Sequence, residues 1–390
     1  MRRMVLGLCC FVSLQLIAFS AGAQQPVKIG LIMTYTGQFA DAAAQMDNGI
    51  KLYMEEHGDT VAGRKIELIR KDTAGASDAA KRLAQEMIVN DNIDILAGFV
   101  ITPEALTVAD LSVEAKKFMV VMNAATSIIT TKSPYITRSS VTLPQNCEVL
   151  GTFAFQNGAR RVFTMVSDYA PGRDAETSFQ RAFKASGGQI VDSVRVPMAN
   201  PDFSAFVQRA KDSGADGVFV FVPGGSQPAA LAKVLIERGM TPKSIKIMGQ
   251  GELADESALK AMGDSAVGII TAFHYDYTHD SAENRRFVAA YNAAFKRNPD
   301  FFSVGGYDGM HLIYEALKKT GGGTDGSGLI DAVKGMKWES PRGPVSIDPE
   351  TRDIINTVYI RRVEKIDGVV RNVEIAKFEN VKDPVKARMK

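Results

Sequence analysis

The sequence predicts an α/β protein made of two doubly wound lobes. Short apolar, β-branched runs recur along the chain, helix-length or loop segments separate them, and the pattern occurs twice in succession. Runs of this kind are typical of strands that a parallel sheet buries on both faces. About 365 residues remain once an N-terminal export segment is set aside, which is enough for two cores rather than one.

The first series of predicted elements occupies the N-terminal part of the chain. We expect strands at 27–33 (VKIGLIM), 65–72 (KIELIRKD), 93–100 (IDILAGFV) and 118–124 (FMVVMNA). Between the first two, residues 41–57 place Met46, Ile50 and Tyr53 at helical spacing, with charged side chains elsewhere. This periodicity predicts an amphipathic helix that crosses over between parallel strands.

A second series follows the stretch PYITRSSVTLPQN. It predicts strands at 161–168, 188–197, 216–223, 244–251 and 267–276, with helices at 202–213 and 226–238. The remaining chain predicts helices at 282–297 and 303–320, a Gly-rich break, a short helix and a strand-like segment at 353–365.

The N-terminus has the pattern of a cleaved secretory signal. Arg2 and Arg3 precede the apolar run 4–19, and Ala21-Gly22-Ala23 offers small residues where a signal peptidase cuts. A membrane anchor is the alternative, because the uncharged stretch is long. The small residues and the polar Gln24 favour cleavage at residue 23 and export to the periplasm. Cys9 and Cys10 would leave with the signal.

The composition of the exported chain excludes several functional classes. It keeps 44 basic against 44 acidic residues once Arg2 and Arg3 are lost, so nucleic acid and anionic membranes are poor partners. Cys147 is its one cysteine, so no internal disulfide is possible. The sequence lacks G-x-S-x-G, and its four histidines lack metal-ligand spacing. We therefore expect no enzyme activity, no cofactor and no metal.

One short stretch, IMGQGELADES at 247–257, has the glycine spacing of a dinucleotide-binding turn. Glu252, Asp255 and Glu256 would place negative charge where a pyrophosphate should meet helix N–H groups. A lone match of this kind is weak. An ordinary junction of strand, loop and helix is the favoured interpretation.

Eight motifs in order resemble the type I periplasmic solute-binding proteins of ABC importers, in the branch of the leucine/isoleucine/valine-binding proteins. They are IGLIMTYTGQFADAAAQMDNGIKLYMEE, AGFVITPEAL, MNAAT, SDYAPGRDA, DGVFVFVPGG, NRRFVAAYNAAF, GYDGMHLIYEAL and RGPVSIDPETRD. The resemblance implies two Rossmann-like lobes, joined by three hinge crossovers, that close on a small solute. It assigns 24–141 and 273–345 to the first lobe and 142–272 and 346–390 to the second. It also implies an ABC permease as partner and, we expect, a monomer.

The predicted ligand site lies where strands end. Parallel sheets bind ligands at the carboxyl ends of their strands, and the exits here are polar, small or aromatic. The resemblance matches Thr102, Ala124, Ala125 and Thr126 to positions that bind a carboxylate. Aromatic candidates at or near the exits are Tyr35, Phe39, Phe99, Tyr169, Phe273, His274 and Tyr275. Without the resemblance, the threonines could be helix caps and the aromatic residues could be core or rim residues.

The second-lobe loop bears on the kind of ligand. Amino-acid binders of this branch present a glutamate there to the ligand's ammonium group, whereas Gln250 and Gly251 fill the centre of this loop and Glu252 lies one position later. A displacement by one residue turns a side chain another way. A buried ammonium without a counter-charge is costly, so we predict an aromatic or 2-oxo acid. An amino acid, or a sensor role in place of import, are the alternatives.

Overall fold

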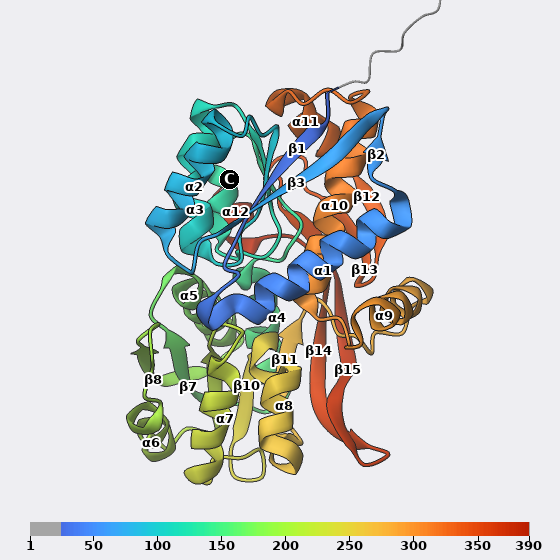
Figure 1. Ribbon diagram of the computed structural model, residues 1–390. Coiled ribbons are helices and arrows are strands. Elements are labelled where there is room, and N and C mark those ends of the chain that lie inside the picture. Colours follow the sequence, from blue (N-terminus) through green and yellow to red (C-terminus); the bar gives the residue numbers. More distant parts are fainter. Residues whose placement is uncertain (1–24, 390) are drawn as a thin grey trace, which may run out of the picture.

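The computed structural model describes residues 25–389, and the predicted export signal lies outside this range. Two lobes, each built on one sheet, lie one above the other in Figure 1. Thirteen-residue strands near the C-terminus, β14 (Ile354–Ile366) and β15 (Val369–Val381), run along the side of the second lobe. The fold is thus the two-lobed α/β arrangement that the sequence predicts.

The first sheet has six strands, and all neighbours except β2 and β3 run parallel. In sheet order they are β2 (Thr60–Val61), β3 (Arg64–Asp72), β1 (Val27–Met33), β4 (Ile95–Gly98), β5 (Phe118–Val121) and β6 (Ile136–Arg138). Successive residues of β1 face opposite sides of the sheet, so Leu31 packs in one core and Ile32 in the other. This explains why the strand is apolar throughout.

Helices cover both faces of the first sheet. One face packs against α1 (Ala40–His57), α10 (Phe301–Lys319) and α11 (Gly326–Val333), and the other against α2 (Ser77–Val89) and α3 (Thr102–Glu114). The helix α9 (Ala282–Phe295) joins the first of these cores through Phe287 and Tyr291. Residues from both ends of the chain therefore build one lobe.

The second sheet has nine strands. Besides β14 and β15 it contains β12 (Lys337–Ser340), β13 (Gly343–Ile347), β11 (Ile270–Phe273), β10 (Lys246–Gln250), β9 (Gly217–Phe221), β7 (Arg161–Ser167) and β8 (Gln189–Val196). The strands β7 to β11 run parallel to one another, whereas β14 pairs antiparallel with β11.

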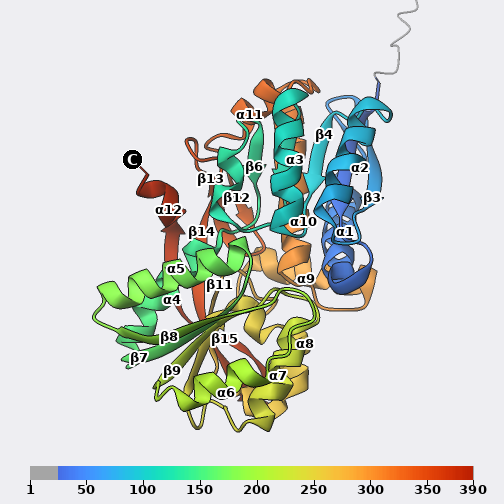
Figure 2. The ribbon, with the colours of Figure 1, turned by 90° about the vertical axis from the view of Figure 1, so that its left-hand side faces the viewer.

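Helices also cover both faces of the second sheet. On one face lie α4 (Leu143–Gln156) and α5 (Ala170–Ala185), and on the other α6 (Ser204–Asp212), α7 (Gln227–Glu237) and α8 (Glu256–Met262). Figure 2 shows the short helix α12 (Pro384–Ala387) at the junction of the two lobes, where it contacts α4. The C-terminus therefore ends near the hinge.

The chain passes between the lobes three times. These passages follow β6, β11 and β13, at residues 139–142, 274–281 and 348–353. The strands β12 and β13 extend the second sheet, yet Val345 and Ile347 pack in the core of the first lobe. Because these strands belong to one lobe by pairing and to the other by packing, the residue limits of the lobes stay a prediction.

The stretch 247–257 forms a junction of strand, turn and helix, as the favoured interpretation expects. The strand β10 runs into a short 3-10 helix, Gly251–Ala254, and then into α8. A Cβ atom at Gly249 would lie 2.7 Å from the Val220 carbonyl oxygen, and one at Gly251 would overlap the Phe273 ring. The two glycines therefore permit close packing inside the sheet.

Candidate functional site

A narrow cavity lies between the lobes, at the carboxyl ends of the parallel strands. Its first-lobe lining follows β1, β4 and β5, and its second-lobe lining follows β7, β9 and β10. The lining residues are Phe39, Val100, Ile101, Thr102, Asn123, Ala124, Ala125, Leu143, Tyr169, Pro171, Phe221, Pro223, Gly224, Glu252 and Phe302. Both lobes thus contribute to one site, at the sheet edge where doubly wound folds bind ligands.

Hydroxyl and N–H groups gather at the first-lobe end of the cavity. Thr102 is the first residue of α3, and its Oγ1 donates a hydrogen bond to Thr126 Oγ1 at 3.1 Å. The Ala124 N–H donates to the Phe99 carbonyl at 3.0 Å, so that group is engaged. Within residues 25–389, the N–H groups of Thr102, Ala125 and Thr126 have no acceptor. An anion could accept from them, aided by the helix N-terminus.

The second-lobe end of the cavity presents one carboxyl group. Glu252 follows β10, and its Oε2 accepts a hydrogen bond from the Gly224 N–H. Gln250, in contrast, is buried and turns its Oε1 toward the Glu252 N–H at 2.9 Å. The loop therefore presents the glutamate rather than the glutamine to the cavity.

The pKa of Glu252 is raised to about 8. Loss of water around the carboxyl group is the main cause, the Gly224 N–H opposes it, and the charge of Asp255 adds to it. Glu252 keeps a small accessible surface inside the cavity while protein atoms surround it. At neutral pH this carboxyl group is therefore mostly protonated.

Aromatic rings form the walls between these two ends. Tyr169 stacks on Phe221 with ring centroids 6.2 Å apart and an angle of 15° between the planes. Phe302, just inside α10, and Phe39, before α1, come from the first lobe. Flat apolar walls of this kind match a ring or another flat apolar body.

The two lobes touch across the cavity. A Cβ atom at Gly225 would lie 2.7 Å from the Gln38 carbonyl oxygen, and one at Gly224 would lie 3.1 Å from the Phe302 ring. The space open to the centre of a water molecule is ≈ 30 Å³, which is room for two or three waters. This is a closed form of the cleft, so a ligand can enter only if the lobes separate or the wall side chains rotate.

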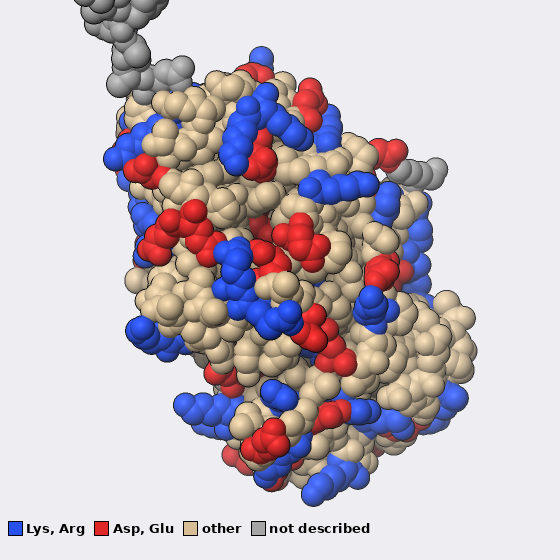
Figure 3. Space-filling model, turned by 90° about the vertical axis from the view of Figure 1, so that its right-hand side faces the viewer, with Lys and Arg blue, Asp and Glu red and all other residues tan. Residues whose placement is uncertain are grey.

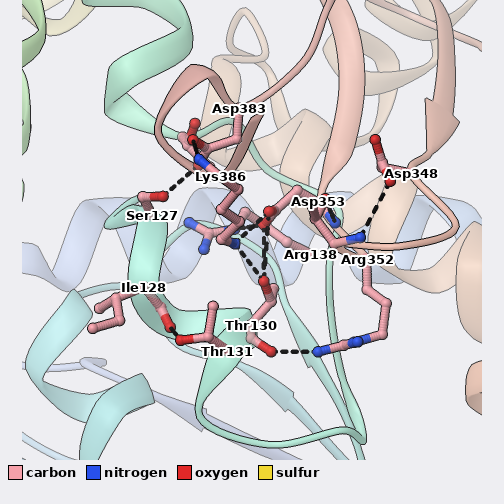
Figure 4. Close-up of polar contacts among 12 residues, drawn as sticks. Ser127, Ile128, Thr130, Thr131, Arg138, Asp348, Arg352, Asp353, Asp383 and Lys386 are labelled. Carbon is pink, nitrogen blue, oxygen red and sulfur yellow. Dashed lines mark hydrogen bonds and ion pairs between the residues drawn. The ribbon is translucent and has the colours of Figure 1, made fainter. Parts of the chain in front are cut away.

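A buried cluster of charges lies behind the segment 124–127, and Figure 4 shows its members Arg138, Asp353 and Lys386. Arg138 is fully buried and donates to the carbonyl oxygens of Ala124 and Thr126, each at 2.8 Å, and to Asp353 Oδ1 at 3.1 Å. Asp353 lies in the third passage between the lobes and also pairs with Lys386 of α12. The hinge and the C-terminal helix therefore fix the backbone that lines the cavity.

The same segment is tied to the second lobe and to the tail. The Ser127 N–H donates to Asp174 of α5 at 2.9 Å, and its Oγ donates to Asp383 at 2.6 Å. Because α5 begins beside Tyr169 and Pro171 of the cavity, the bond to Asp174 joins the two sides of the site. Burial raises the pKa of Asp174, as expected for a carboxyl group between two lobes.

The structure brings six of the sequence-predicted site residues to the cavity. These are Phe39, Thr102, Ala124, Ala125, Tyr169 and Glu252. Thr126 lies behind Thr102 and reaches the cavity through that hydroxyl. The assignment of these residues to a ligand stays a prediction.

The structure places the other predicted residues outside the lining. Phe99 packs in the core between α2, α3 and the sheet, and Gln250 caps the turn after β10. Tyr275 donates to Asn284 Oδ1 at 3.0 Å, while Phe273 and His274 pack against Phe301. Tyr35 lies beside Asp47 and Arg70. Each of these side chains is packed in a core or lies against a neighbouring group, so it does not line the cavity. Most of them nevertheless lie at or just after the end of a strand, where the sequence predicted the site.

Several lining residues were not predicted. They are Val100, Ile101, Asn123, Leu143, Pro171, Phe221, Pro223, Gly224 and Phe302. Phe221 to Gly224 end a predicted strand, so the strand-exit argument could have found them. Leu143 begins α4 shortly after β6, a strand too short to predict, and Phe302 belongs to α10, distant in sequence from the other strand exits. No local signal identifies either residue.

A second hollow, of ≈ 520 Å³, lies between residues 279–281, just before α9, and the strands β12 to β15. Glu339, Glu374 and Glu379 line it, so it repels anions. Figure 3 shows acidic and basic side chains interspersed over this face. Among residues 25–389 no group of three or more His, Cys, Asp or Glu side chains is placed to hold a metal. Nor is any helix in this range both long and apolar enough to cross a membrane.

The fold and site define a class of protein, the two-lobed α/β proteins that enclose a small ligand in the cleft between their lobes. The chain belongs to the periplasmic binding protein family, whose model matches residues 26–368. It is 44% identical to a "Leu/Ile/Val-binding protein homolog 6" of Brucella melitensis over 373 residues, 94% of this chain and 95% of that protein.

Solved structures of ABC transporter solute-binding proteins from Rhodopseudomonas palustris are also similar. One from strain BisB5, in complex with 3,4-dihydroxybenzoic acid, is 55% identical, has a TM-score of 0.90 and covers 93% of this chain and 99% of its own. Another, in complex with 4-hydroxybenzoate, is 43% identical, also with a TM-score of 0.90, over 93% of this chain and 100% of its own.

Proposed function

We propose that the chain is the solute-binding component of an ABC importer and that it captures an aromatic or 2-oxo carboxylate. The observation that carries the proposal is the cavity itself. It has hydroxyl and N–H donors at one end, aromatic walls along its length, and no lysine, arginine or histidine in its lining. Two similar proteins were solved with hydroxylated benzoates, which supports a ligand of this class.

The ligand carboxylate would lie at the first-lobe end. Thr102 Oγ1–H, turned from Thr126 Oγ1 toward the ligand, and the N–H groups of Ala125 and Thr126 would donate to it. Each bond would contribute about 1.5 to 3 kcal/mol because the acceptor is charged. The ring or apolar body would lie between Phe39 and Phe302 of one lobe and Tyr169 of the other. Contacts to both lobes would favour the closed form.

The N-terminal pattern supports export. Cleavage after Ala23 would release a chain that begins at Gln24, and an ABC permease of the inner membrane would receive the loaded protein. We expect the protein to act as a monomer. A sensor that docks on a receptor would use the same cleft, and genes for a permease and an ATPase beside this one would favour import.

An amino-acid ligand is the second candidate, and one observation favours it. Glu252 lies in the cavity, although the sequence left open whether it could reach a ligand. Its carboxylate could pair with a ligand's ammonium group. A relative that is 44% identical also carries the name of a Leu/Ile/Val-binding protein homolog.

A thermal-shift screen of purified protein separates these candidates. Benzoate, 4-hydroxybenzoate, phenylpyruvate, phenylalanine and leucine are compared at equal concentrations, because a ligand that binds the native state raises Tm. We expect the aromatic and 2-oxo acids to raise Tm and the amino acids to leave it unchanged. A shift with leucine or phenylalanine alone would replace the proposal with the second candidate.

A further inference from the structure

The cavity holds one carboxyl group that the binding of a simple carboxylate does not use. Glu252 lies on the second lobe, whereas Thr102, Ala125 and Thr126 lie on the first. It is the one carboxyl-bearing residue in the lining, and no cationic side chain lines the cavity beside it. A ring held by its carboxylate at the first-lobe end would direct its far edge toward the second lobe.

One of the two carboxyl oxygens of Glu252 is already engaged. Oε2 accepts from the Gly224 N–H, and within residues 25–389 Oε1 has no hydrogen-bond partner. The group that best satisfies such an atom is small, polar and uncharged, since a second ligand carboxylate would repel an ionised Glu252. A hydroxyl has these properties because it can both donate and accept.

The surroundings of Glu252 fit a neutral partner better than a cationic one. The titratable groups near it are Asp255 after the turn, Tyr169 at the start of α5 and Cys147 of α4, and none carries a positive charge. Loss of water raises the pKa of Glu252 to about 8, so its carboxyl group can donate as well as accept at neutral pH.

We propose that Glu252 is a specificity-determining residue that binds a ring hydroxyl remote from the ligand carboxylate. The preferred ligands are then hydroxylated aromatic acids rather than unsubstituted ones. This inference rests on the proposed function and adds to it the substitution on the ring.

Calorimetry at pH 7 with benzoate, 4-hydroxybenzoate and 4-methylbenzoate tests the inference. The methyl compound is the control for size, because it fills the same position without a hydrogen bond. We expect the wild-type protein to bind 4-hydroxybenzoate at least about tenfold more tightly than either of the others, which corresponds to one satisfied buried hydrogen bond.

Two variants assign that preference to Glu252. Glu252→Leu should reduce the preference for 4-hydroxybenzoate to less than about threefold, whereas Glu252→Gln should keep most of it, because an amide also donates and accepts. Glu256→Gln, the same change on an exposed glutamate of α8, is the matched control and should keep the wild-type ratio. Ratios between ligands cancel any general loss of binding that a variant causes.

The outcomes separate this inference from the proposed function. Equal binding of all three benzoates by the wild type, or an unchanged ratio in Glu252→Leu, would overturn the role of Glu252 and leave the aromatic ligand class in place. Binding of none of them, with tight binding of leucine that Glu252→Gln abolishes, would overturn both and assign Glu252 to an ammonium group.

Discussion

At the scale of single residues, the cavity has hydrogen-bond donors at one end and a carboxyl group at the other. Donors without acceptors lie on the first lobe around Thr102, and the carboxyl group of Glu252 lies on the second. Donors attract an anion and the neutral acid does not repel it, so one small cavity can accept a carboxylate without a cationic side chain.

Thr102→Val tests the first-lobe end. Valine has nearly the same shape, but it removes the hydroxyl that bonds Thr126 and lines the cavity. We expect carboxylate affinity to fall roughly ten- to a hundredfold by calorimetry, the loss of one charge-assisted bond. Thr60→Val, at an exposed threonine of β2, should bind as the wild type does. Unchanged affinity in Thr102→Val would exclude this hydroxyl from the site.

The raised pKa of Glu252 predicts that the free energy of unfolding depends on pH. The folded protein holds this proton up to about pH 8, while the unfolded chain releases it near the ordinary glutamate pKa of 4.5. Between these values the folded state binds more protons, so stability relative to Glu252→Gln should fall as pH rises, by at most about 1.4 kcal/mol per pH unit. Denaturant unfolding from pH 5 to 9 measures it, and a difference independent of pH would contradict the shift.

At the scale of elements, the sequence predicts those with an apolar pattern of their own. Strand β1 and the helix α1 occupy nearly the predicted residues. The three-residue β6 is too short to show a pattern, and β15 alternates with charged side chains because much of it is partly exposed. The site residues fall into the same two groups. Thr102 and Tyr169 lie at strand exits, where the sequence predicted ligand contacts, whereas Phe302 reaches the cavity because α10 packs on the first sheet.

The loop after β9 is the element that closes against the first lobe. In Gly225→Ala the new methyl group would meet the Gln38 carbonyl oxygen, so the variant should favour the open form and bind ligand at least about tenfold more weakly. Gly239→Ala is the control, since it also has a positive φ but open space around it. Small-angle scattering with saturating benzoate should show a larger radius of gyration for Gly225→Ala alone. Normal closure of that variant would contradict the closed contact.

We expect the ion pair between Lys386 of α12 and Asp353 of the third passage to stabilise the hinge. Lys386→Met would remove one buried charge-assisted bond from Asp353 and leave it paired with Arg138 alone, at a cost of about 1.5 to 3 kcal/mol in the free energy of unfolding. Lys377→Met removes an exposed ion pair with Glu379 and should cost less than about 1 kcal/mol. Denaturant unfolding compares the two variants, and equal losses would show that the cluster does not support the hinge.

For the whole molecule, two lobes and three passages create one site that neither lobe holds alone. The donors, the aromatic walls and Glu252 come together in the closed cleft, where Gly224 and Gly225 meet the first lobe. We therefore expect ligand binding and lobe closure to be coupled, with the chemistry of the ligand deciding whether it contacts both lobes at once.

Calorimetric titration of the purified mature protein with a matched pair of ligands tests the ligand preference of the cavity most directly. Phenylpyruvate and phenylalanine share a skeleton and differ chiefly at the carbon that bears the amine. With donors at one end of the cavity and a mostly neutral Glu252 at the other, we expect phenylpyruvate and benzoates to bind more tightly than phenylalanine or leucine. Tight binding of phenylalanine or leucine, with no binding of the aromatic and 2-oxo acids, would contradict it.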